Sequence, residues 1–466
     1  MNNPIDAYLR KNEQRFVDEL CELLRIPSVS TKDENRTDIQ RAARYVVDKL
    51  TSAGADNVAI MPTEGHPVVY GEKVIDPKLP TILVYGHYDV QPAEPLDQWN
   101  SPPFEPTIRD GKIYARGATD DKGQMYMHVK AFEAMMATHS LSTNVKFLIE
   151  GEEELGSPSL GTFCRNNRAL LAADVALISD TAIVANNVPA IETGLRGLVY
   201  FEVNVRALAH DLHSGLYGGA VPNAAIILAE MLASLHDTRG RVAIPHFYDG
   251  VQTVSARERA QMAVRPHSDR TYMREAGAKA LQGERGFTTL ERTSIRPTLE
   301  VNGIWGGYIQ PGSKTIIPAE ASAKISTRLV PGQDPKKIAK LVMAHLKKIA
   351  PKSAGITVRQ LDGAGKPYVM PIESIGYRAA EEAMTTTFGK KPIPIRSGGS
   401  IPVTALFEDV LGIKSVLMGF GLESDNLHAP NEHYGLFNYH KGIETIPHFF
   451  AAYARLARAG ATKKRN

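Results

Sequence analysis

Histidine and aspartate stand together after an apolar run early in the chain. The run Thr81–Tyr85 is bounded by proline and glycine and predicts a buried strand, and the letters GHYD follow it directly. In extended chain, His87 and Asp89 point to the same side. A carboxylate beside an imidazole can hold one ring nitrogen while the other nitrogen binds a metal ion. The alternative interpretation of the pair is an ordinary surface loop.

Carboxylates gather in two further places. Asp120 and Asp121 stand just before a predicted helix at 123–136, where one Asp suits the helix N-terminus and two exceed what a cap requires. The second gathering, after a predicted strand at 145–149, is Glu150, Glu152, Glu153 and Glu154. Carboxylates this close repel one another unless a cation is present. An exposed acidic loop is the alternative for this group.

Asp180 and His428 complete a set of candidate metal ligands without thiolates. Asp180 ends a predicted strand at 174–179, and His428 lies in the run LHAPNEH. The chain has 2 cysteines, so a metal ion would have to be bound by His, Asp or Glu. Two histidines and several carboxylates suit one or two divalent ions. A pair of ions about 3.5–4 Å apart needs a bridging ligand, and a carboxylate serves this purpose.

Strand and helix patterns alternate around these clusters. Helices are predicted near 16–24, 39–50 and 123–136, and buried strands at 81–85, 145–149 and 174–179. The alternation predicts an α/β fold in which a mostly parallel sheet is covered by helices. The polar clusters follow strand ends or glycine-rich turns, and the carboxyl edge of such a sheet is where sites are built.

The pattern changes after Gly194. Strands are predicted at 197–208, 298–304, 320–330 and 356–361, and helices at 223–235 and 335–350. The order β-α-β-β-α-β is that of a two-layer, ferredoxin-like α+β unit. We therefore expect an inserted domain at 195–367, between the first part (1–194) and the second part (368–466) of the domain that holds the polar clusters.

Composition and charge exclude several classes of protein. Hydrophobic residues make up 43% and charged residues 23%, close to the globular averages of about 45–50% and about 25%. A net charge of +3 is too balanced for a protein that binds nucleic acid by neutralising phosphates. The sequence has no apolar run near the ~20 residues of a membrane span and no apolar core of a secretory signal. Two cysteines exclude a disulfide scaffold and favour a cytoplasmic protein.

Ordered motifs resemble a known family. The runs YGHYDVQP, ARGATDDKG, EGEEELGS, LISD and HAPNEH resemble, in this order, those of the di-metal aminopeptidase-like clan. The resemblance is to its cytosolic non-specific dipeptidase and carnosinase branch, and it extends to DLHSGLYGG, SKTIIP, STRLVPG and SGGSIPVT. It covers residues 6 to 445. It implies a hydrolase-like metallopeptidase catalytic domain and an inserted lid and dimerisation domain.

The resemblance also implies a role for individual residues. His87, Asp120 and Asp180 would bind one divalent ion, and Asp120, Glu154 and His428 the other, with Asp120 bridging. Asp89 would hold the His87 ring, Glu153 would be the general base, and Glu152 would only flank it. A cis peptide bond is expected between Asp120 and Asp121. Zinc is the expected metal, with manganese or cobalt as alternatives.

The inserted domain is expected to contribute to substrate binding. His213 matches a family residue that reaches into the active site of a partner subunit, which implies a homodimer through this domain. Arg328 and Thr315 match contacts to the carboxylate end of the substrate, and Gly399 and Ser400 lie on the same wall. A guanidinium fork suits a carboxylate because it can bind both oxygens.

These expectations converge on the hydrolysis of dipeptides. Glu153 would take a proton from water held between two divalent ions, and His213 would stabilise the oxyanion that forms. The nearest alternative is an N-acyl amino acid deacylase of the same clan, of the acetylornithine deacetylase or succinyl-diaminopimelate desuccinylase type. A non-catalytic binding relative is a second alternative, although every ligand and the base are present. A serine hydrolase is not favoured, because no serine lies in a G-x-S-x-G motif.

Overall fold

In the computed structural model, which describes residues 4–254, 256–264, 268–361, 364–399 and 401–463, the chain divides into two units. The first comprises Met1–Thr193, Met370–Ile395 and Leu406–Asn466, and the second comprises Gly194–Val369 and Arg396–Ala405. The sequence analysis grouped residues 396–405 with 368–466. They belong instead to the second unit, where Arg196 holds them. Its backbone N–H and its Nε donate hydrogen bonds to the carbonyl oxygens of Gly399 (3.0 Å) and Gly398 (3.2 Å).

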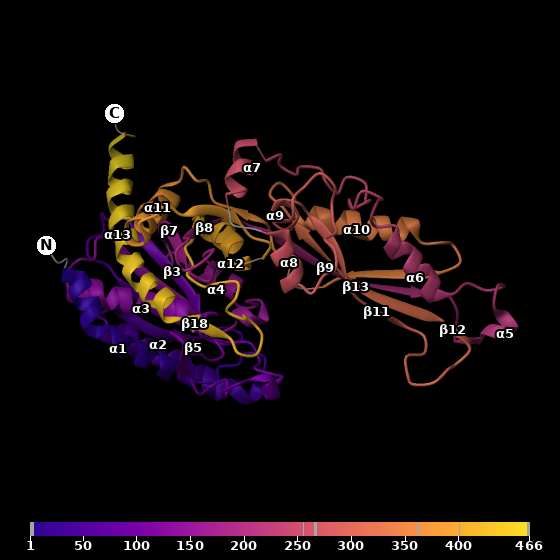
Figure 1. Ribbon diagram of the computed structural model, residues 1–466, viewed down its shortest axis with the longest axis horizontal. Coiled ribbons are helices and arrows are strands. Elements are labelled where there is room, and N and C mark those ends of the chain that lie inside the picture. Colours follow the sequence, from indigo (N-terminus) through magenta and orange to yellow (C-terminus); the bar gives the residue numbers. More distant parts are fainter. Residues whose placement is uncertain (1–3, 255, 265–267, 362–363, 400, 464–466) are drawn as a thin grey trace. The chain divides into compact units, whose positions relative to one another are not determined.

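A mixed sheet forms the centre of the first unit (Figure 1). Its strands follow the order β1 (Asp56–Met61), β2 (Val68–Lys73), β6 (Asn144–Glu150), β3 (Thr81–His87), β7 (Val175–Ile178), β17 (Ser415–Leu417), β8 (Ala190–Leu195) and β15 (Tyr368–Val369), and β16 (Ile393–Arg396) also pairs with β8. The central strands β6, β3, β7 and β17 run parallel, as predicted. The flanking pairs are antiparallel, and the sequence did not predict them.

The carboxyl ends of the parallel strands meet at one edge of this sheet. His87 on β3 is paired with Glu150 on β6, and Tyr85 with Ile178 on β7. These strands are buried along almost their whole length, which is typical of strands covered on both faces. The polar residues that follow each apolar run therefore emerge side by side.

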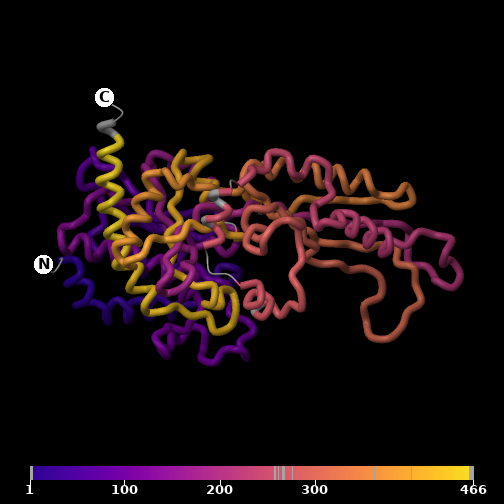
Figure 2. The backbone as a smooth tube through the Cα atoms, turned by 45° about the horizontal axis from the view of Figure 1, so that its top comes forward, coloured from indigo at the N-terminus to yellow at the C-terminus, as the bar shows by residue number. Residues whose placement is uncertain are grey.

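Helices from distant parts of the chain pack on one buried helix. α3 (Lys122–Ala137) is buried on every side from Lys122 to Phe132, because β3, α1 (Pro4–Leu24) and α13 (Leu436–Lys463) contact it. Figure 2 shows the indigo α1 and the yellow α13 in the same unit. The remaining elements here are α2 (Arg36–Ser52), α4 (Leu160–Asn166), α11 (Ile375–Phe388), η1 (Asp33–Asn35), η2 (Leu96–Gln98), η3 (Glu153–Leu155), the π-helix η4 (Phe407–Leu411) and the small sheet of β18 (His433–Gly435), β5 (Lys112–Tyr114) and β4 (Thr107–Arg109).

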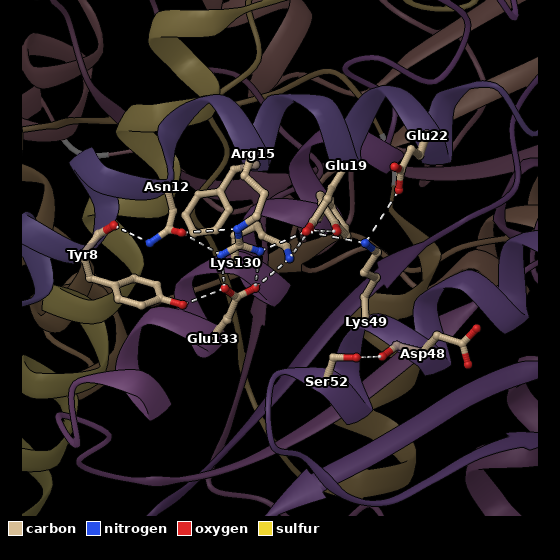
Figure 3. Close-up of polar contacts among 12 residues, drawn as sticks. Tyr8, Asn12, Arg15, Glu19, Glu22, Asp48, Lys49, Ser52, Lys130 and Glu133 are labelled. Atoms are coloured by element: carbon tan, nitrogen blue, oxygen red, sulfur yellow. Dashed lines mark hydrogen bonds and ion pairs between the residues drawn. The ribbon is translucent and has the colours of Figure 1, made fainter.

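A network of charged side chains fastens α1 to α3 (Figure 3). We call Arg15, Glu19, Lys130 and Glu133 the Lys130 cluster. Lys130 is 1% exposed, and its Nζ donates to Glu19 and, at 2.7 Å, to Glu133. Arg15 donates to both carboxylates from the other side. Burial alone would raise the pKa of Glu19, but hydrogen bonds and charge from Lys130, with further donors on Tyr126 and Arg15, lower it to about 2.

The second unit is a two-layer structure. Its main sheet is antiparallel in the order β11 (Thr298–Gly306), β13 (Glu320–Leu329), β9 (Gly197–Arg206) and β14 (Gly355–Gln360). Alternate residues of β9 are buried and form one apolar core with α6 (Ala224–Ala233) and α10 (Pro335–Ile349). The chain order β-α-β-β-α-β confirms the predicted ferredoxin-like arrangement. The shorter elements are β10 (Leu212–His213), α5 (Ser214–Tyr217), α7 (Ala256–Met262), α8 (Asp269–Glu275), α9 (Thr289–Ser294), β12 (Ile316–Ile317) and α12 (Pro402–Leu406).

Candidate metal centre and active site

The five predicted metal ligands come from five separate segments, and the structure brings all of them together. His87 ends β3, Asp120 stands just before α3, Glu154 lies in η3, Asp180 follows β7, and His428 lies in the loop after β17. They form two groups that share Asp120. Within each group, the potential ligand atoms all lie within 4.8 Å of one another.

The first group consists of His87, Asp120 and Asp180. The Nε2 atom of His87 lies 3.2 Å from Oδ1 of Asp120 and 3.9 Å from Oδ2 of Asp180. His87 is fully buried, and among the described residues its Nε2 has no hydrogen-bond partner. A buried polar atom in this position is costly unless something binds it. A divalent cation would satisfy it together with the two carboxylates.

The second group consists of Asp120, Glu154 and His428. The Nε2 atom of His428 lies 2.8 Å from Oδ2 of Asp120 and 3.4 Å from Oε2 of Glu154. The other carboxylate oxygen of Glu154 is buried, with no hydrogen-bond partner in the part of the chain that the structure describes. Asp120 thus turns one oxygen to each group, which is the geometry of a bridging carboxylate. The peptide bond that follows Asp120 is cis, as the resemblance implied.

Carboxylates outnumber the basic groups that face them. Burial raises the pKa of Asp180 well above its usual value, and the neighbouring Asp121 and Asp120 raise it further. Burial and then Asp120 raise the pKa of Glu154 to about 8. Shifts in this direction mean that the folded chain resists holding all of these negative charges at once. The residues present therefore fit two divalent cations, which would supply the missing positive charge.

Asp89 supports the centre in two ways. Its Oδ1 lies 3.3 Å and its backbone carbonyl oxygen 3.1 Å from Nδ1 of His87, so that Nε2 is left to face the ligand group. Asp89 also accepts hydrogen bonds from the backbone N–H groups of Glu153 (3.2 Å) and Glu154 (3.1 Å). The sequence analysis did not predict this second role, in which one carboxylate fixes both His87 and the turn that carries Glu154.

Glu153 begins η3 beside the ligands but belongs to neither ligand group. Burial raises its pKa, and the Asp120 and Asp89 carboxylates raise it further, against the opposing effect of His87. A carboxylate with a raised pKa next to a metal centre is suited to accept and return protons near neutral pH. Its position therefore fits the predicted general base.

The other two carboxylates of the acidic run belong to neither ligand group and bind other partners. Glu152 is 4% exposed and accepts hydrogen bonds from the backbone N–H groups of His66 (2.7 Å) and Ser159 (3.2 Å). Glu150 accepts from the hydroxyl groups of Tyr85 and Ser157. Both hold neighbouring loops in place. The sequence reasoning gave no such role to either residue. Some of their partners are distant in sequence, and the others are a backbone N–H group and a serine hydroxyl group, which carry no recognisable motif.

Gln91 is a further residue that the sequence reasoning missed. Its Nε2 donates a 2.8 Å hydrogen bond to Oε2 of Glu154, the oxygen that faces His428. It lies within the run YGHYDVQP, so the signal was present in the motif itself. Gln91 restrains the Glu154 side chain in the orientation that the second ligand group requires.

The candidate substrate residues of the second unit fall into two places. His213 pairs with Ile316 across β10 and β12, and the adjacent Ser214 N–H donates to the carbonyl oxygen of Thr315, so that His213 and Thr315 lie together. Arg328 lies near the carboxyl end of β13, opposite Leu198 of β9. Gly399 is held by Arg196, two residues before Leu198. Ser400 lies outside the described residues.

Comparisons with known proteins place the chain in a family. The sequence model of peptidase family M20/M25/M40 matches residues 83–452. The chain belongs to this family. A Beta-Ala-His dipeptidase of Homo sapiens is 33% identical to this M20 peptidase over 474 residues, which cover 96% of this chain and 92% of that protein. A Cys-Gly metallodipeptidase of Schizosaccharomyces pombe is 31% identical and covers 93% of this chain and 94% of that protein.

A solved structure supports the same relationship. The M20 family metallo-carboxypeptidase Sso-CP2 from Sulfolobus solfataricus superposes with a TM-score of 0.85 at 34% identity, covering 94% of this chain and 99% of that one. The resemblance found in the sequence is thus confirmed, and this M20 peptidase is a metal-dependent enzyme that acts on peptide bonds. None of the helices in the described residues is long and apolar enough to cross a membrane.

Proposed function

We propose that this M20 peptidase is a dipeptidase whose active site holds two divalent ions bridged by Asp120. The observation that carries the proposal is the pair of ligand groups that share Asp120, with Glu153 beside them and outside both groups. The relatives named Beta-Ala-His dipeptidase and Cys-Gly metallodipeptidase match nearly the whole chain, which supports a dipeptide as the substrate.

We propose zinc as the metal. The donor set of two imidazoles and three carboxylates, without thiolate, suits zinc and also accepts manganese or cobalt. The two ions, when bound, would polarise the scissile carbonyl and lower the pKa of the attacking water. Glu153 accepts the proton that this water loses and delivers it to the leaving amine. Asp89 keeps the His87 ring and the η3 turn in the geometry that this transfer needs.

The substrate carboxylate would be bound by Arg328 with Gly399. Burial lowers the pKa of Arg328 from its ordinary value, yet this guanidinium stays charged at neutral pH and can form two parallel hydrogen bonds with a carboxylate. A requirement for a free carboxylate next to the cleaved bond would favour dipeptides over internal bonds of long chains.

His213 and Arg328 do not come together within one chain. A strand rises about 3.3 Å per residue, so Glu320 and Arg328, near the two ends of β13, are roughly 26 Å apart. His213 and Thr315 lie beyond the amino end of that strand. Thr315 and Arg328 therefore do not bind one carboxylate from the same chain. We infer that each active site takes His213 and Thr315 from a partner subunit, in a homodimer.

The second unit offers a surface for this dimer. β11 forms one edge of its sheet, and an edge strand presents backbone N–H and C=O groups that can pair with another strand. Apolar side chains on and after β11 are exposed, among them Ile304 (62%), Trp305 (43%) and Ile309 (75%). Pairing of β11 with β11 of a second copy would cover them and is compatible with two-fold symmetry.

Replacing Glu153 with Gln tests the proposed reaction. The Glu153→Gln protein should still bind two metal ions per chain, because Glu153 is in neither ligand group. Its kcat should fall by about 10²–10⁴-fold, the usual contribution of a general base. Metal analysis and a dipeptide hydrolysis assay measure both. Near-normal turnover would falsify the assignment of Glu153.

A substrate panel separates the proposed function from its nearest alternatives. Dipeptides, N-acyl amino acids and longer peptides should be compared by kcat/KM in the wild-type enzyme. The proposal expects dipeptides to be preferred. A preference for N-acyl amino acids would assign the enzyme to the deacylases, and release of single residues from longer peptides would favour the activity named for the Sulfolobus relative.

Mixing two inactive variants tests the shared site. His213→Ala should lose about 10²–10³-fold in turnover by analogy with the loss of one oxyanion donor. A mixture of the Glu153→Gln and His213→Ala chains should regain about a quarter of wild-type activity. Half of the randomly assorted dimers would be mixed, with one intact site of two. No recovery after confirmed subunit exchange would mean that His213 acts within its own chain or not at all.

We also propose a cytoplasmic location. Both cysteines, Cys21 and Cys164, are free and buried, which is compatible with a reducing compartment. Cell fractionation with an antibody against the chain tests this.

A further inference from the structure

The carboxylate of Glu432 lies where two loops of the first unit meet. One loop, Ala115–Asp121, joins β5 to α3 and carries the bridging Asp120. The other follows β17, carries His428, and leads into β18. Glu432 stands four residues after His428 and is fully buried at 0% exposure. The reaction proposed above gives this carboxylate no part.

Glu432 accepts hydrogen bonds from the loop that carries Asp120. Its Oε1 accepts from the backbone N–H groups of Thr119 (3.0 Å) and Asp120 (3.1 Å). Its Oε2 accepts from the backbone N–H of Gly117 and from Nη1 of Arg116, both at 2.8 Å. Both oxygens are thus used twice, and one donor is the N–H of the bridging residue itself.

The loop depends on these bonds for its shape. It contains neither helix nor strand up to the start of α3. Gly117 has a φ of +82°, and a Cβ atom there would lie 2.6 Å from Val90, so the backbone turns where only glycine fits. Buried N–H groups outside regular structure need an acceptor from elsewhere. The carboxylate of Glu432 accepts hydrogen bonds from three such N–H groups, those of Gly117, Thr119 and Asp120.

The charge of Glu432 is matched by Arg116. Arg116 is 1% exposed, donates to Glu432 through Nη1, and donates to the carbonyl oxygen of Pro92 through Nη2. Two hydrogen bonds to backbone carbonyl groups reinforce the contact. The N–H of Ala115 donates to the carbonyl of Glu432 (3.1 Å), and Oγ1 of Thr119 donates to that of His433 (2.7 Å).

We propose that Glu432 is a positioning residue that shapes the Gly117–Asp120 backbone so that Asp120 presents one oxygen to each ligand group, an inference that rests on the proposed di-metal function. It also ties this loop to the segment that carries His428. One buried carboxylate therefore sets the relative placement of the bridging ligand and of a ligand of the second group. Its loss weakens the binding of both ions, because both ligand groups contain Asp120.

Metal titration of the Glu432→Gln enzyme tests the proposal. Gln keeps the size of the side chain but turns an NH₂ group toward two of the four donors, so two donors lose their acceptor. The full-length protein is freed of metal with EDTA and titrated with Zn²⁺ by calorimetry, beside the wild type. We expect both dissociation constants to rise by about 10–100-fold, the usual cost of removing a group that orients a ligand.

A matched control separates positioning from simple loss of stability. Glu291 is likewise buried at 4% exposure and accepts from an arginine, Arg259, and from the backbone N–H of Thr288. It lies in the second unit. The Glu291→Gln enzyme should lose stability in urea and bind Zn²⁺ like the wild type. Glu432→Gln should differ from it in metal affinity.

Each outcome decides between two explanations. A folded Glu432→Gln protein with Zn²⁺ affinities within about twofold of the wild type would overturn the proposal. If Glu432→Gln does not fold, Glu432→Asp keeps the charge opposite Arg116 and shortens the reach to the backbone. Wild-type affinity in that variant would overturn the proposal as well. A wild-type chain that takes up no Zn²⁺ would refute the di-metal function itself.

Discussion

Two buried groups of charged side chains lie along α3, and they differ in how their charges are matched. In the Lys130 cluster, Glu19 and Glu133 share Lys130 and Arg15, and the pKa of each carboxyl falls below its usual value despite burial (Figure 3). At the amino end of the same helix, the metal centre sets carboxylates against two imidazoles. There burial and like charge raise the pKa of Glu154 and Asp180.

The difference separates a structural ion-pair network from a site that lacks cations. Lys130 and His87 are almost fully buried, whereas Arg15 and His428 are partly exposed, so each group is only partly desolvated. In the Lys130 cluster, Lys130 and Arg15 lower the pKa of both carboxylates despite burial.

At the metal centre, the two imidazoles hold the pKa of Asp120 low despite burial but leave those of Glu154 and Asp180 raised. Carboxylates whose pKa values are raised and whose oxygens also lie within ligand distance of one another therefore mark the region where a cation can bind. A raised pKa alone does not, because that of Glu432, which pairs with Arg116, is raised too.

Removing Asp120 should have the largest effect of the substitutions that test this comparison, because it removes a member of both ligand groups. In the Asp120→Ala enzyme both ligand groups lose a member, so metal content should fall from two ions per chain and dipeptide hydrolysis should drop to the level of a protein-free control. The metal-free variant should unfold at a lower urea concentration than the metal-free wild type, because His428 and His87, which hold the pKa of Asp120 below its usual value despite burial, lose their carboxylate partner. Metal analysis, activity and urea unfolding measure these effects. A variant that retained two ions would exclude Asp120 as the bridge.

Removing Lys130 should destabilise the protein and leave the metal centre intact. Lys130→Met removes a buried ammonium from the partly exposed Glu19 and Glu133, which keep Arg15, and losing a hydrogen bond to a charged group costs about 1.5–3 kcal/mol. Urea unfolding measures the loss, and metal content should stay at two ions per chain. The control is Lys414→Met, which breaks an exposed pair with Glu408 and should cost about 0–1 kcal/mol. Equal losses of unfolding free energy in Lys130→Met and Lys414→Met would contradict the structural role assigned to the Lys130 cluster.

The metal-free enzyme should lose stability as the pH rises. The folded-state pKa of Glu154 is raised to about 8 from an ordinary value of 4.5, so its contribution is complete below 4.5 and is lost as the pH rises through 8. Urea unfolding in EDTA from pH 5 to pH 9 should show this decline. The decline in stability should be smaller in Glu154→Gln and absent when the metal is bound. A stability that does not change with pH in EDTA would show that burial and neighbouring charge do not disfavour the ionised form of Glu154.

The Lys130 cluster should give the opposite and smaller pH dependence. The folded-state pKa of Glu19 is lowered to about 2, so its stabilisation is present above 4.5 and is lost as the pH falls toward 2. Unfolding curves of the wild type and of Glu19→Gln should therefore converge as the solution is acidified between these values. Curves that stay parallel would mean that Glu19 is not stabilised by its ion pairs.

The sequence predicted the elements that are buried on both faces and the ligands that follow them. β3, β6 and β7 are short continuous apolar runs, and such runs can be recognised without knowing their neighbours. β1 is mostly exposed and carries no such pattern, so the antiparallel strands at this edge of the sheet were not predicted. The five candidate ligands could be singled out because each stands at a strand end or in an ordered motif, and the structure brings them together.

Roles that depend on distant partners could not be predicted. Lys130 reads as one charged residue within a helix, and its partner Glu19 comes from another helix 111 residues earlier. Glu152 and Glu154 are two residues apart, yet one holds a loop and the other faces His428. The length of β13 separates Thr315 from Arg328 within one chain, and this separation becomes visible only when the register is known.

The separation of His213 from Arg328 along β13 has a consequence for the enzyme at work. If each active site takes His213 from a partner subunit, as we propose, a single chain contains all five candidate metal ligands but lacks a catalytic residue, because β13 holds its own His213 away from Arg328. Dilution that dissociates the dimer would then abolish hydrolysis without any loss of bound metal ions. Specific activity would then rise with enzyme concentration, by mass action alone.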